Sequence, residues 1–114
     1  MSDRVDPTGY HAHVYDPTGE SGLQELHTRA EQELDSIRVG RLRAQPVGPH
    51  AEPMFQLPFE THQLSTVLAW LLRHRDGRSV LVHPLHGNVR REHDEDALWL
   101  GAKLPLDLDK LGPA

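Results

Sequence analysis

The order of the elements predicts an α+β fold, with the sequence strand–helix–strand–strand–helix–strand. Four short segments place apolar residues at alternate positions, and two longer segments repeat them at helical spacing. This order is that of a ferredoxin-like βαββαβ sandwich, in which both helices cover one face of the sheet. With 114 residues, the chain is expected to form one domain that spans residues 1–114.

The first half of the chain contains two strands and one helix. Asp-Pro-Thr-Gly, which favours a type I turn, occurs at Asp6–Gly9 and again at Asp16–Gly19. The two turns bracket an expected strand, Tyr10–Tyr15. A helix is predicted over Glu20–Ile37, and a second strand over Arg38–Arg43. The expected buried stripe of the helix is Leu23, Leu26, Ala30, Leu34 and Ile37.

The second half repeats the pattern. A third strand is predicted over Pro53–Phe59, followed by a helix that begins at Thr61 as its N-cap and ends at Gly77. A fourth strand is predicted over Ser79–His83. The charged segment Gly87–Asp96 is expected to be a loop.

Composition excludes several classes of function. The net charge is −5 and no run of Lys or Arg occurs, so no nucleic-acid partner is expected. No apolar stretch is long enough to cross a bilayer, and the N-terminus lacks a signal-peptide pattern, so a cytoplasmic location without membrane contact is expected. Cysteine is absent and histidine occurs nine times. Any metal must therefore be bound through nitrogen and oxygen.

The histidines of the strands are predicted to share one face of the sheet. If Ala12 and Val14 face the helices, strand alternation leaves His11 and His13 on the open face. The same reasoning places His83 there, and His50 with Glu52 if the third strand extends backwards. The first and third strands are expected to be parallel neighbours, with the fourth antiparallel to the first. On that arrangement the four histidines converge at one edge: His11, His13, His50 and His83.

The remaining histidines are expected to play a smaller part. His27, His62, His74 and His86 are interpreted as solvated side chains, whereas His93 lies in a charged loop that could fold over the open face. The open face itself lacks apolar cover. We therefore expect a homodimer in which two sheets pack face to face and form an α/β-barrel around the sites.

Six stretches of the chain resemble the DOPA 4,5-dioxygenase family of small extradiol dioxygenases. They are YHAHVY (Tyr10–Tyr15), VGR (Val39–Arg41), PVGPH (Pro46–His50), PMFQ (Pro53–Gln56), SVLVHP (Ser79–Pro84) and ALWLGAKLPLDL (Ala97–Leu108). The resemblance implies Fe(II), molecular oxygen, a catechol substrate and a dimeric ferredoxin-like architecture. Leu85-His86-Gly87 and the pair Arg90-Arg91 depart from the family pattern.

The resemblance and the convergence together suggest roles for individual residues. His13, His50 and His83 are the expected metal ligands, with Glu52 as a candidate carboxylate; Zn or Ni can replace Fe(II) on purification. His11 and His13 are the expected catalytic residues, with His11 either the fourth ligand or the acid/base, since a neutral imidazole can bind metal or transfer a proton near pH 7.

Substrate contacts are expected from three residues of the open face and its surroundings, namely Tyr15, Arg41 and His93. Arg41 shares a face with Arg43, and the pair either binds a substrate carboxylate or is simply solvated.

Two alternatives to the dioxygenase remain open at this level. The chain could be a non-catalytic barrel that binds metal or a small ligand and that takes Zn(II) or Ni(II) as readily as iron. It could also be a cofactor-free monooxygenase that acts on quinols, although the histidine cluster argues against that function.

Overall fold

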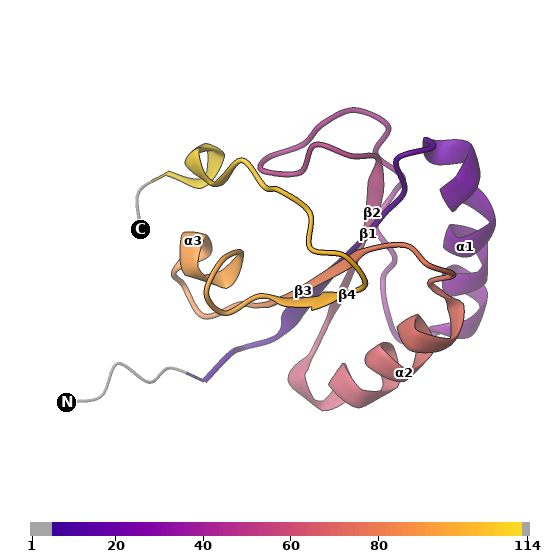
Figure 1. Ribbon diagram of the computed structural model, residues 1–114. Coiled ribbons are helices and arrows are strands. Elements are labelled where there is room, and N and C mark those ends of the chain that lie inside the picture. Colours follow the sequence, from indigo (N-terminus) through magenta and orange to yellow (C-terminus); the bar gives the residue numbers. More distant parts are fainter. Residues whose placement is uncertain (1–5, 113–114) are drawn as a thin grey trace.

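The structure, a computed structural model, describes residues 6–112. Its four strands form one antiparallel sheet in the order β2-β1-β3-β4. Figure 1 shows helices α1 and α2 together on one side of the sheet, with α3 and the C-terminal segment away from them. The elements are β1 (Tyr10–Tyr15), α1 (Glu20–Glu33), β2 (Met54–Phe59), a 3-10 turn (Thr61–Gln63), α2 (Leu64–His74), β3 (Val80–Pro84), α3 (Val89–Glu92), β4 (Leu98–Leu100) and a final 3-10 turn (Leu108–Leu111).

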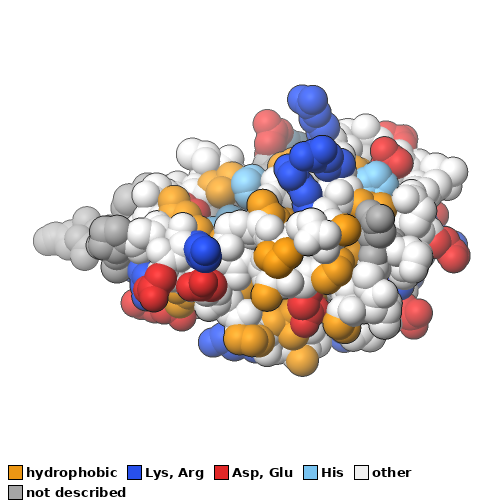
Figure 2. Space-filling view, turned by 90° about the horizontal axis from the view of Figure 1, so that it is seen from above, with side chains coloured by type: hydrophobic (Ala, Val, Ile, Leu, Met, Phe, Trp, Pro, Cys, Tyr) orange, Lys and Arg blue, Asp and Glu red, His pale blue; other side chains and the backbone are white. Residues whose placement is uncertain are grey.

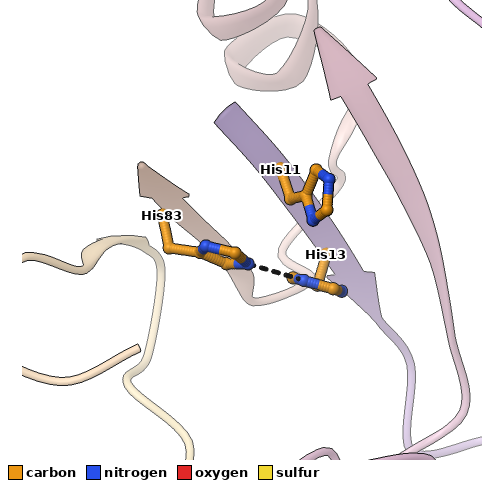
Figure 3. A group of neighbouring side chains, drawn as sticks. All are labelled: His11, His13 and His83. Atoms are coloured by element: carbon orange, nitrogen blue, oxygen red, sulfur yellow. Dashed lines mark hydrogen bonds between the residues drawn. The ribbon is translucent and has the colours of Figure 1, made fainter. Parts of the chain in front are cut away.

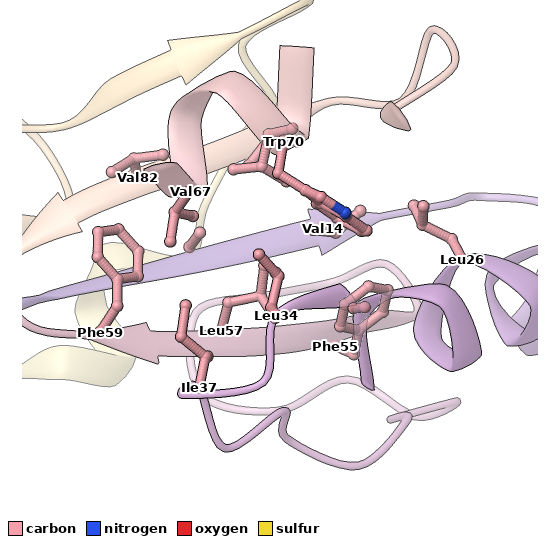
Figure 4. Packing of buried hydrophobic residues seen from close by; sticks show 14 of the residues in the cluster. Val14, Leu26, Leu34, Ile37, Phe55, Leu57, Phe59, Val67, Trp70 and Val82 are labelled. Atoms are coloured by element: carbon pink, nitrogen blue, oxygen red, sulfur yellow. The ribbon is translucent and has the colours of Figure 1, made fainter. Parts of the chain in front are cut away.

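The main core lies between the sheet and helices α1 and α2. Alternate residues of the strands, among them Val14, Phe55 and Val82, point into it (Figure 4). All five residues of the predicted α1 stripe are buried there, and so are Val67 and Leu71 of α2. The sequence pattern therefore predicted correctly which strand face meets the helices. That assignment also fixes the opposite face, where the polar side chains of the strands lie.

The segment predicted as a second strand is not one. Within residues 38–43 only Arg43 forms a β-bridge, to Met54. The segment nevertheless follows the outer edge of β2, because the Gly40 N–H donates to the Gln56 carbonyl at 2.8 Å and Arg43 exchanges two backbone hydrogen bonds with Met54. Glycine at position 40 favours this approach, since a Cβ there would make a tight contact of 3.0 Å with the Gln56 carbonyl oxygen.

The predicted parallel pairing of the strands Tyr10–Tyr15 and Met54–Phe59 is wrong. They are antiparallel, with Tyr10 opposite Phe59 and Tyr15 opposite Met54. The predicted antiparallel pairing with the strand that ends near His83 is confirmed, because Tyr10 lies opposite Pro84. The start of β1 therefore meets the ends of both neighbouring strands.

Both helices are shorter than predicted. Helix α1 ends at Glu33, and Leu34 and Ile37 join the core from the turn that follows it. Helix α2 begins at Leu64 after the 3-10 turn, so Thr61 is not its N-cap, and it ends at His74. Among the described residues, no helix is long and apolar enough to cross a membrane.

The chain covers part of the second sheet face itself. Tyr15, Met54 and Leu81 form a small buried cluster there, against which five partly buried residues pack. These five are Val47, Ala97, Trp99, Leu104 and Leu106. The remainder of this face carries the histidines. In the view of Figure 2, basic side chains gather beside histidine and hydrophobic side chains on the face that it shows.

Candidate metal and substrate site

Three histidines of the central strands lie on one face, as predicted. His11 and His13 belong to β1, and His83 of β3 is directly opposite His11 in the strand register. Figure 3 shows the three rings turned toward one another. The Nε2 atoms of His13 and His83 are only 3.1 Å apart, and both side chains are buried. His11 is half-buried, and its ring centroid lies 5.2 Å from that of His83.

His50 joins this group from a loop and not from the start of a strand. Because β2 is antiparallel to β1, its start lies beside Tyr15 and away from His11. A tight turn closed by two hydrogen bonds between Val47 and His50 carries the imidazole back over the sheet. Its ring centroid lies 4.1 Å from that of His13, and its Nδ1 lies 2.7 Å from the Tyr15 hydroxyl. The predicted convergence therefore occurs, but the predicted reason for His50 is wrong.

Helix α3 adds two residues to the cluster. The loop that carries His93 does fold over the open face, as anticipated: the imidazole is buried, and its centroid lies 3.9 Å from that of His83. Its neighbour Glu92 is also buried, with Oε1 at 4.0 Å from His83 Nδ1. The other carboxylate oxygen accepts hydrogen bonds from the backbone N–H groups of His86 and Gly87, at 2.8 and 2.9 Å. Glu92 thus fixes the loop that positions His93.

Six side chains form three overlapping groups in which all ligand atoms lie within 4.8 Å of one another. The groups are His11 with His13 and His83, His13 with His50 and His93, and His83 with Glu92 and His93. The three predicted ligands do not make one such group: His13 links two groups, whereas His50 and His83 fall in different ones. His93, predicted to contact substrate, belongs to two groups.

Burial lowers the pKa of four histidines of the cluster, His11, His13, His50 and His83, and so favours their neutral form near pH 7. Desolvation and the neighbouring histidine His93 lower the pKa of His50 to about 4, and the same two causes contribute most to lowering that of His83 to about 3. Desolvation, followed by the other histidines, holds the pKa of His13 well below its usual value. The pKa of His11 is lowered too, by burial and by His93. A neutral imidazole keeps a lone pair, which is what a metal ligand requires.

The hydrogen bonds of the cluster indicate which imidazole nitrogens carry a lone pair that could bind a cation. A carbonyl only accepts, so His83 donates from Nδ1 to Pro84, and its Nε2 carries the lone pair. That lone pair faces His13 Nε2. If His13 donates from Nε2, its own Nδ1 lone pair faces the Met54 sulfur at 3.3 Å. Either tautomer of His13 therefore leaves two lone pairs opposed.

A metal ion held by both nitrogens would remove this conflict. The separation of His13 Nε2 and His83 Nε2 is 3.1 Å, which lets both atoms lie about 2.0–2.1 Å from one ion. His93 likewise donates from Nδ1 to the Val89 carbonyl at 2.8 Å, so its Nε2 also carries a lone pair. Nitrogen donors of this kind suit Fe, Zn, Ni and Cu.

A cavity of about 420 Å³ opens onto the cluster. His11, His13, His50, His83 and His93 form part of its wall, and Arg41 and Arg43 form another part. Apolar and small residues complete it: Gly40, Val47, Gly48, Pro49, Met54, Leu85 and Val89, with Gln56. The volume is in the range of pockets that take small organic ligands.

Comparisons with known proteins place the chain in a family, and a family model decides which one. The sequence pattern of the Dopa 4,5-dioxygenase family matches residues 10–110. The chain belongs to the Dopa 4,5-dioxygenase family. A solved structure from Nostoc punctiforme, described as that of a candidate dioxygenase, covers 97% of this chain and 96% of its own at 33% identity, with a TM-score of 0.82.

Curated relatives of this family member are longer proteins. One from Botryotinia fuckeliana, an uncharacterised 21.2 kDa protein, is 34% identical over 93 residues, which are 75% of this chain and 51% of that protein. The DOPA 4,5-dioxygenase of Amanita muscaria is 28% identical over 86 residues, 75% of this chain and 38% of that enzyme. The chain thus spans about half or less of the curated relatives that it matches. Family and neighbours together indicate a dioxygenase-like protein.

Other predicted residues of this Dopa 4,5-dioxygenase family member lie away from the cavity wall. Tyr15, predicted to contact substrate, is buried behind His50. Glu52, the candidate carboxylate, belongs to none of the three ligand groups found among the described residues. Sequence reasoning missed Glu92. The available signal was its position directly before His93, in a loop where Asn88 is a suitable N-cap for a short helix.

The histidines interpreted as solvated divide into two kinds. His62 is largely exposed, as predicted. The other three side chains are mostly shielded from solvent, and each contacts a carboxylate, so that interpretation is wrong for His27, His74 and His86. His27 has a structural role, since its Nε2 donates to the Gly40 carbonyl at 2.8 Å and so holds the segment that carries Arg41.

Proposed function

We propose that this protein is a non-haem Fe(II)-dependent extradiol dioxygenase that cleaves the aromatic ring of a catechol with O2. One observation carries the proposal: a cluster of five imidazoles, with ring nitrogens close enough to share a metal ion, forms part of the wall of a ligand-sized cavity. Membership of the Dopa 4,5-dioxygenase family supports the same chemistry. The donor set also suits Zn(II) and Ni(II), so metal content after purification says little about the functional metal.

We propose as iron ligands the histidines of the overlapping ligand groups. His13, His83 and His93 each lie in two ligand groups, and His13 is taken as the central ligand because it shares a group with His50 and faces His83 Nε2 at 3.1 Å. The predicted ligands His50 and His83 are its neighbours, and His93 is added to them. Iron held by these residues would supply Lewis-acid and redox chemistry for a catechol and O2.

The chain's own residues perform the remaining tasks. His11 is the proposed base for a catechol proton, since its lowered pKa leaves it neutral at pH 7 and it forms part of the cavity wall. Met54, Val47 and Leu85 give the cavity apolar sides that hold the ring and exclude water.

We also propose that the sheet corresponds to the ferredoxin-like order. The segment 38–43 occupies the outer edge of β2 through the hydrogen bonds of Gly40 and Arg43, where that fold has its second strand. Helices α1 and α2 share one face, as the fold requires.

The test of the enzyme is aerobic turnover after anaerobic loading with Fe(II). A panel of catechols is offered, and a yellow ring-opened semialdehyde is expected, with one O2 consumed per product. His13→Asn should abolish both the product and stoichiometric iron binding. The matched control is His62→Asn, which should retain both, because His62 is largely exposed.

The opposite outcome is equally informative. If the wild-type chain binds iron stoichiometrically, remains folded and turns over no catechol, the proposed enzyme is rejected in favour of a metal-binding protein. If His13→Asn retains full iron content, the ligand assignment is rejected.

A further inference from the structure

We propose that Arg90 is a positioning residue for the metal site, because it links helix α3 to the C-terminal segment that also holds the turn of His50. This inference rests on the proposed function and adds to it a residue that lies outside the three ligand groups. It concerns the two proposed ligands that no strand carries, His50 and His93. We call the linking segment, residues 104–112, the strap.

The two ligands outside the strands are held differently from the rest of the cluster. His11, His13 and His83 are fixed by the backbone hydrogen bonds between β1 and β3. His50 instead closes a short turn, and His93 follows a helix of only four residues. A helix of one turn is not stable in isolation. The positions of these two imidazoles therefore depend on contacts from elsewhere in the chain.

One end of the strap is bound by Arg90. Its Nη1 lies 3.2 Å from the carbonyl oxygens of Leu108 and Gly112, and 3.3 Å from Asp109 Oδ1. The Asp109 side chain is 93% exposed. Because exposed ion pairs contribute little, the two carbonyl groups are the contacts that set the geometry. The backbone ties Arg90 to His93 in turn, since the His93 N–H donates to the Arg90 carbonyl at 3.2 Å.

The other end of the strap holds the turn of His50. The Asp107 N–H donates to the carbonyl of Pro49, the residue before His50, at 3.0 Å. Leu106 of the strap and Val47 of the turn pack against the same buried cluster on the second sheet face. In Figure 1 the final turn of the strap lies above α3 and beside the loop that precedes β2. The strap thus connects two ligands that are far apart in the sequence.

The neighbouring Arg91 makes contacts of a different kind. Its guanidinium pairs with Glu95 at 3.8 Å and with Asp96 at 3.6 Å, on the segment that directly follows α3. Within residues 6–112 it makes no hydrogen bond to the strap. Arg91 therefore carries the same charge on the same helix without linking the two ligands, which makes it a matched control for Arg90.

Co(II) binding to the metal-free protein, measured without oxygen by competition with a chelator, tests the inference. Arg90→Gln is expected to raise the dissociation constant about tenfold, the lower end of the effect of outer partners of metal ligands. Charge alone predicts the opposite, because removing a cation near a metal site favours metal binding. The visible absorption of bound Co(II), which depends on the number and geometry of its ligands, should change as well. Arg91→Gln should neither weaken binding nor change the spectrum.

A second variant tests whether the strap carries the effect. Asp107→Pro removes the N–H that binds the Pro49 carbonyl, and proline fits the Asp107 φ of −84°. If the strap links the two ligands, releasing either end loosens both. The double variant with Arg90→Gln should then bind Co(II) no more weakly than the weaker single variant. Arg90→Lys, which retains a cation, should recover part of the affinity.

Thermal unfolding of each metal-free variant separates positioning from stability. A contact that only stabilises the fold would lower the unfolding temperature and leave the Co(II) affinity and spectrum of the folded protein as they are in the wild type. That result for Arg90→Gln overturns the inference. Effects of Arg90→Gln and Asp107→Pro that add in full overturn it too, because the two contacts would then act independently.

Failure of this inference is distinguishable from failure of the enzyme. An Arg90 effect on Co(II) binding in a chain that turns over no catechol retains the positioning role and rejects the dioxygenase. Turnover by an enzyme whose metal affinity does not depend on Arg90 retains the dioxygenase and rejects the positioning role. A wild-type chain that binds no Co(II) rejects both.

Discussion

The Tyr15 hydroxyl shows how one residue outside the cavity can act on the metal site. It lies 2.7 Å from His50 Nδ1, and its ring is stacked on Trp99. Burial, together with the charge of Glu52, raises the pKa of Tyr15, so the phenol stays neutral and its oxygen can accept a hydrogen bond from His50 Nδ1, which leaves the lone pair on His50 Nε2. A hydrogen bond at Nδ1 fixes the orientation of the imidazole and decides which ring nitrogen faces the cluster.

Tyr15→Phe is therefore expected to weaken metal binding without unfolding the chain. The ring and its stacking remain, and partners that orient a ligating histidine typically contribute about 10–100-fold to metal affinity. The dissociation constant is measured by competition with a chelator, alongside thermal unfolding of the metal-free protein. Tyr10→Phe is the control, because Tyr10 stacks on Phe59. Equal affinities for the two variants would refute a role for the hydroxyl.

At this scale the sequence predicted the strand histidines and not their surroundings. Strand alternation is local, so it placed His11, His13 and His83 on one face correctly. The positions of His50 and Glu92 depend on a turn and on a four-residue helix. Neither has a periodic pattern long enough to be recognised, and Glu52, chosen by extending a strand, was misplaced because the chain turns at His50.

At the scale of elements, one ion pair joins the end of β1, the start of α1 and the approach to β3. Arg78 donates to Asp16 at 2.9 Å and to the Gly22 carbonyl at 2.6 Å. Burial by itself would raise the pKa of Asp16, but the hydrogen bonds from Thr18 and the contact with Arg78 outweigh it and hold the pKa below the usual value. The folded chain therefore prefers the ionised carboxylate.

Asp16→Asn is expected to lower the free energy of unfolding near pH 7 by about 1–3 kcal/mol, the cost of losing a charged partner at a mostly buried site. Because the pKa of Asp16 is lower in the folded chain than in the unfolded one, its contribution is present above the unfolded pKa of 3.8. It disappears as the pH falls through the folded value. Urea unfolding of both proteins at a series of pH values checks this.

The control for this prediction is Asp109→Asn, which removes a carboxylate that is almost fully exposed and also pairs with an arginine. Little change is expected there, since exposed ion pairs contribute little. A difference between Asp16→Asn and the wild type that persisted unchanged at low pH would contradict the ionised-carboxylate explanation.

Element boundaries were predicted less well than element identities, and each error has a physical cause. The helical stripe continued to Ile37, but Leu34 and Ile37 remain buried after the helix has ended. Apolar periodicity indicates which residues are buried, but it does not distinguish a buried residue within a helix from one in the turn that follows. The segment 38–43 has the sequence of a strand but meets β2 at only a few backbone groups. The parallel pairing was inconsistent with the predicted element order: a strand that follows the second one without a helix between them runs antiparallel to it and to the first strand, as the structure shows for β2.

At the scale of the whole molecule, we propose that the chain forms a homodimer through the second sheet face. The sequence predicted a bare face, whereas the structure shows the chain's own Ala97, Trp99, Leu104 and Leu106 packed over part of it. The cavity still opens on this side, and Val89 on its wall is exposed. The proposed homodimer would cover this remaining opening.

Sedimentation velocity at micromolar concentration should therefore give a mass near twice 12.9 kDa. Val89→Asp should shift the protein to the monomer, because a charge on the covered face opposes association. Leu72→Asp is the control, since Leu72 is an exposed residue of α2 on the other side of the molecule. A wild-type monomer at these concentrations would rule out the dimer.

The order of the sheet also has a kinetic consequence. β1 precedes both of its partners in the sequence, yet it lies between them. During synthesis it leaves the ribosome with two unpaired edges and stays so until β2 and β3 have been made. Contacts such as that between His13 and His83 close a loop of most of the chain, which makes folding slow for a protein of this size. The arrangement that assembles the histidines is thus also the one that leaves the nascent chain open to pairing with other chains.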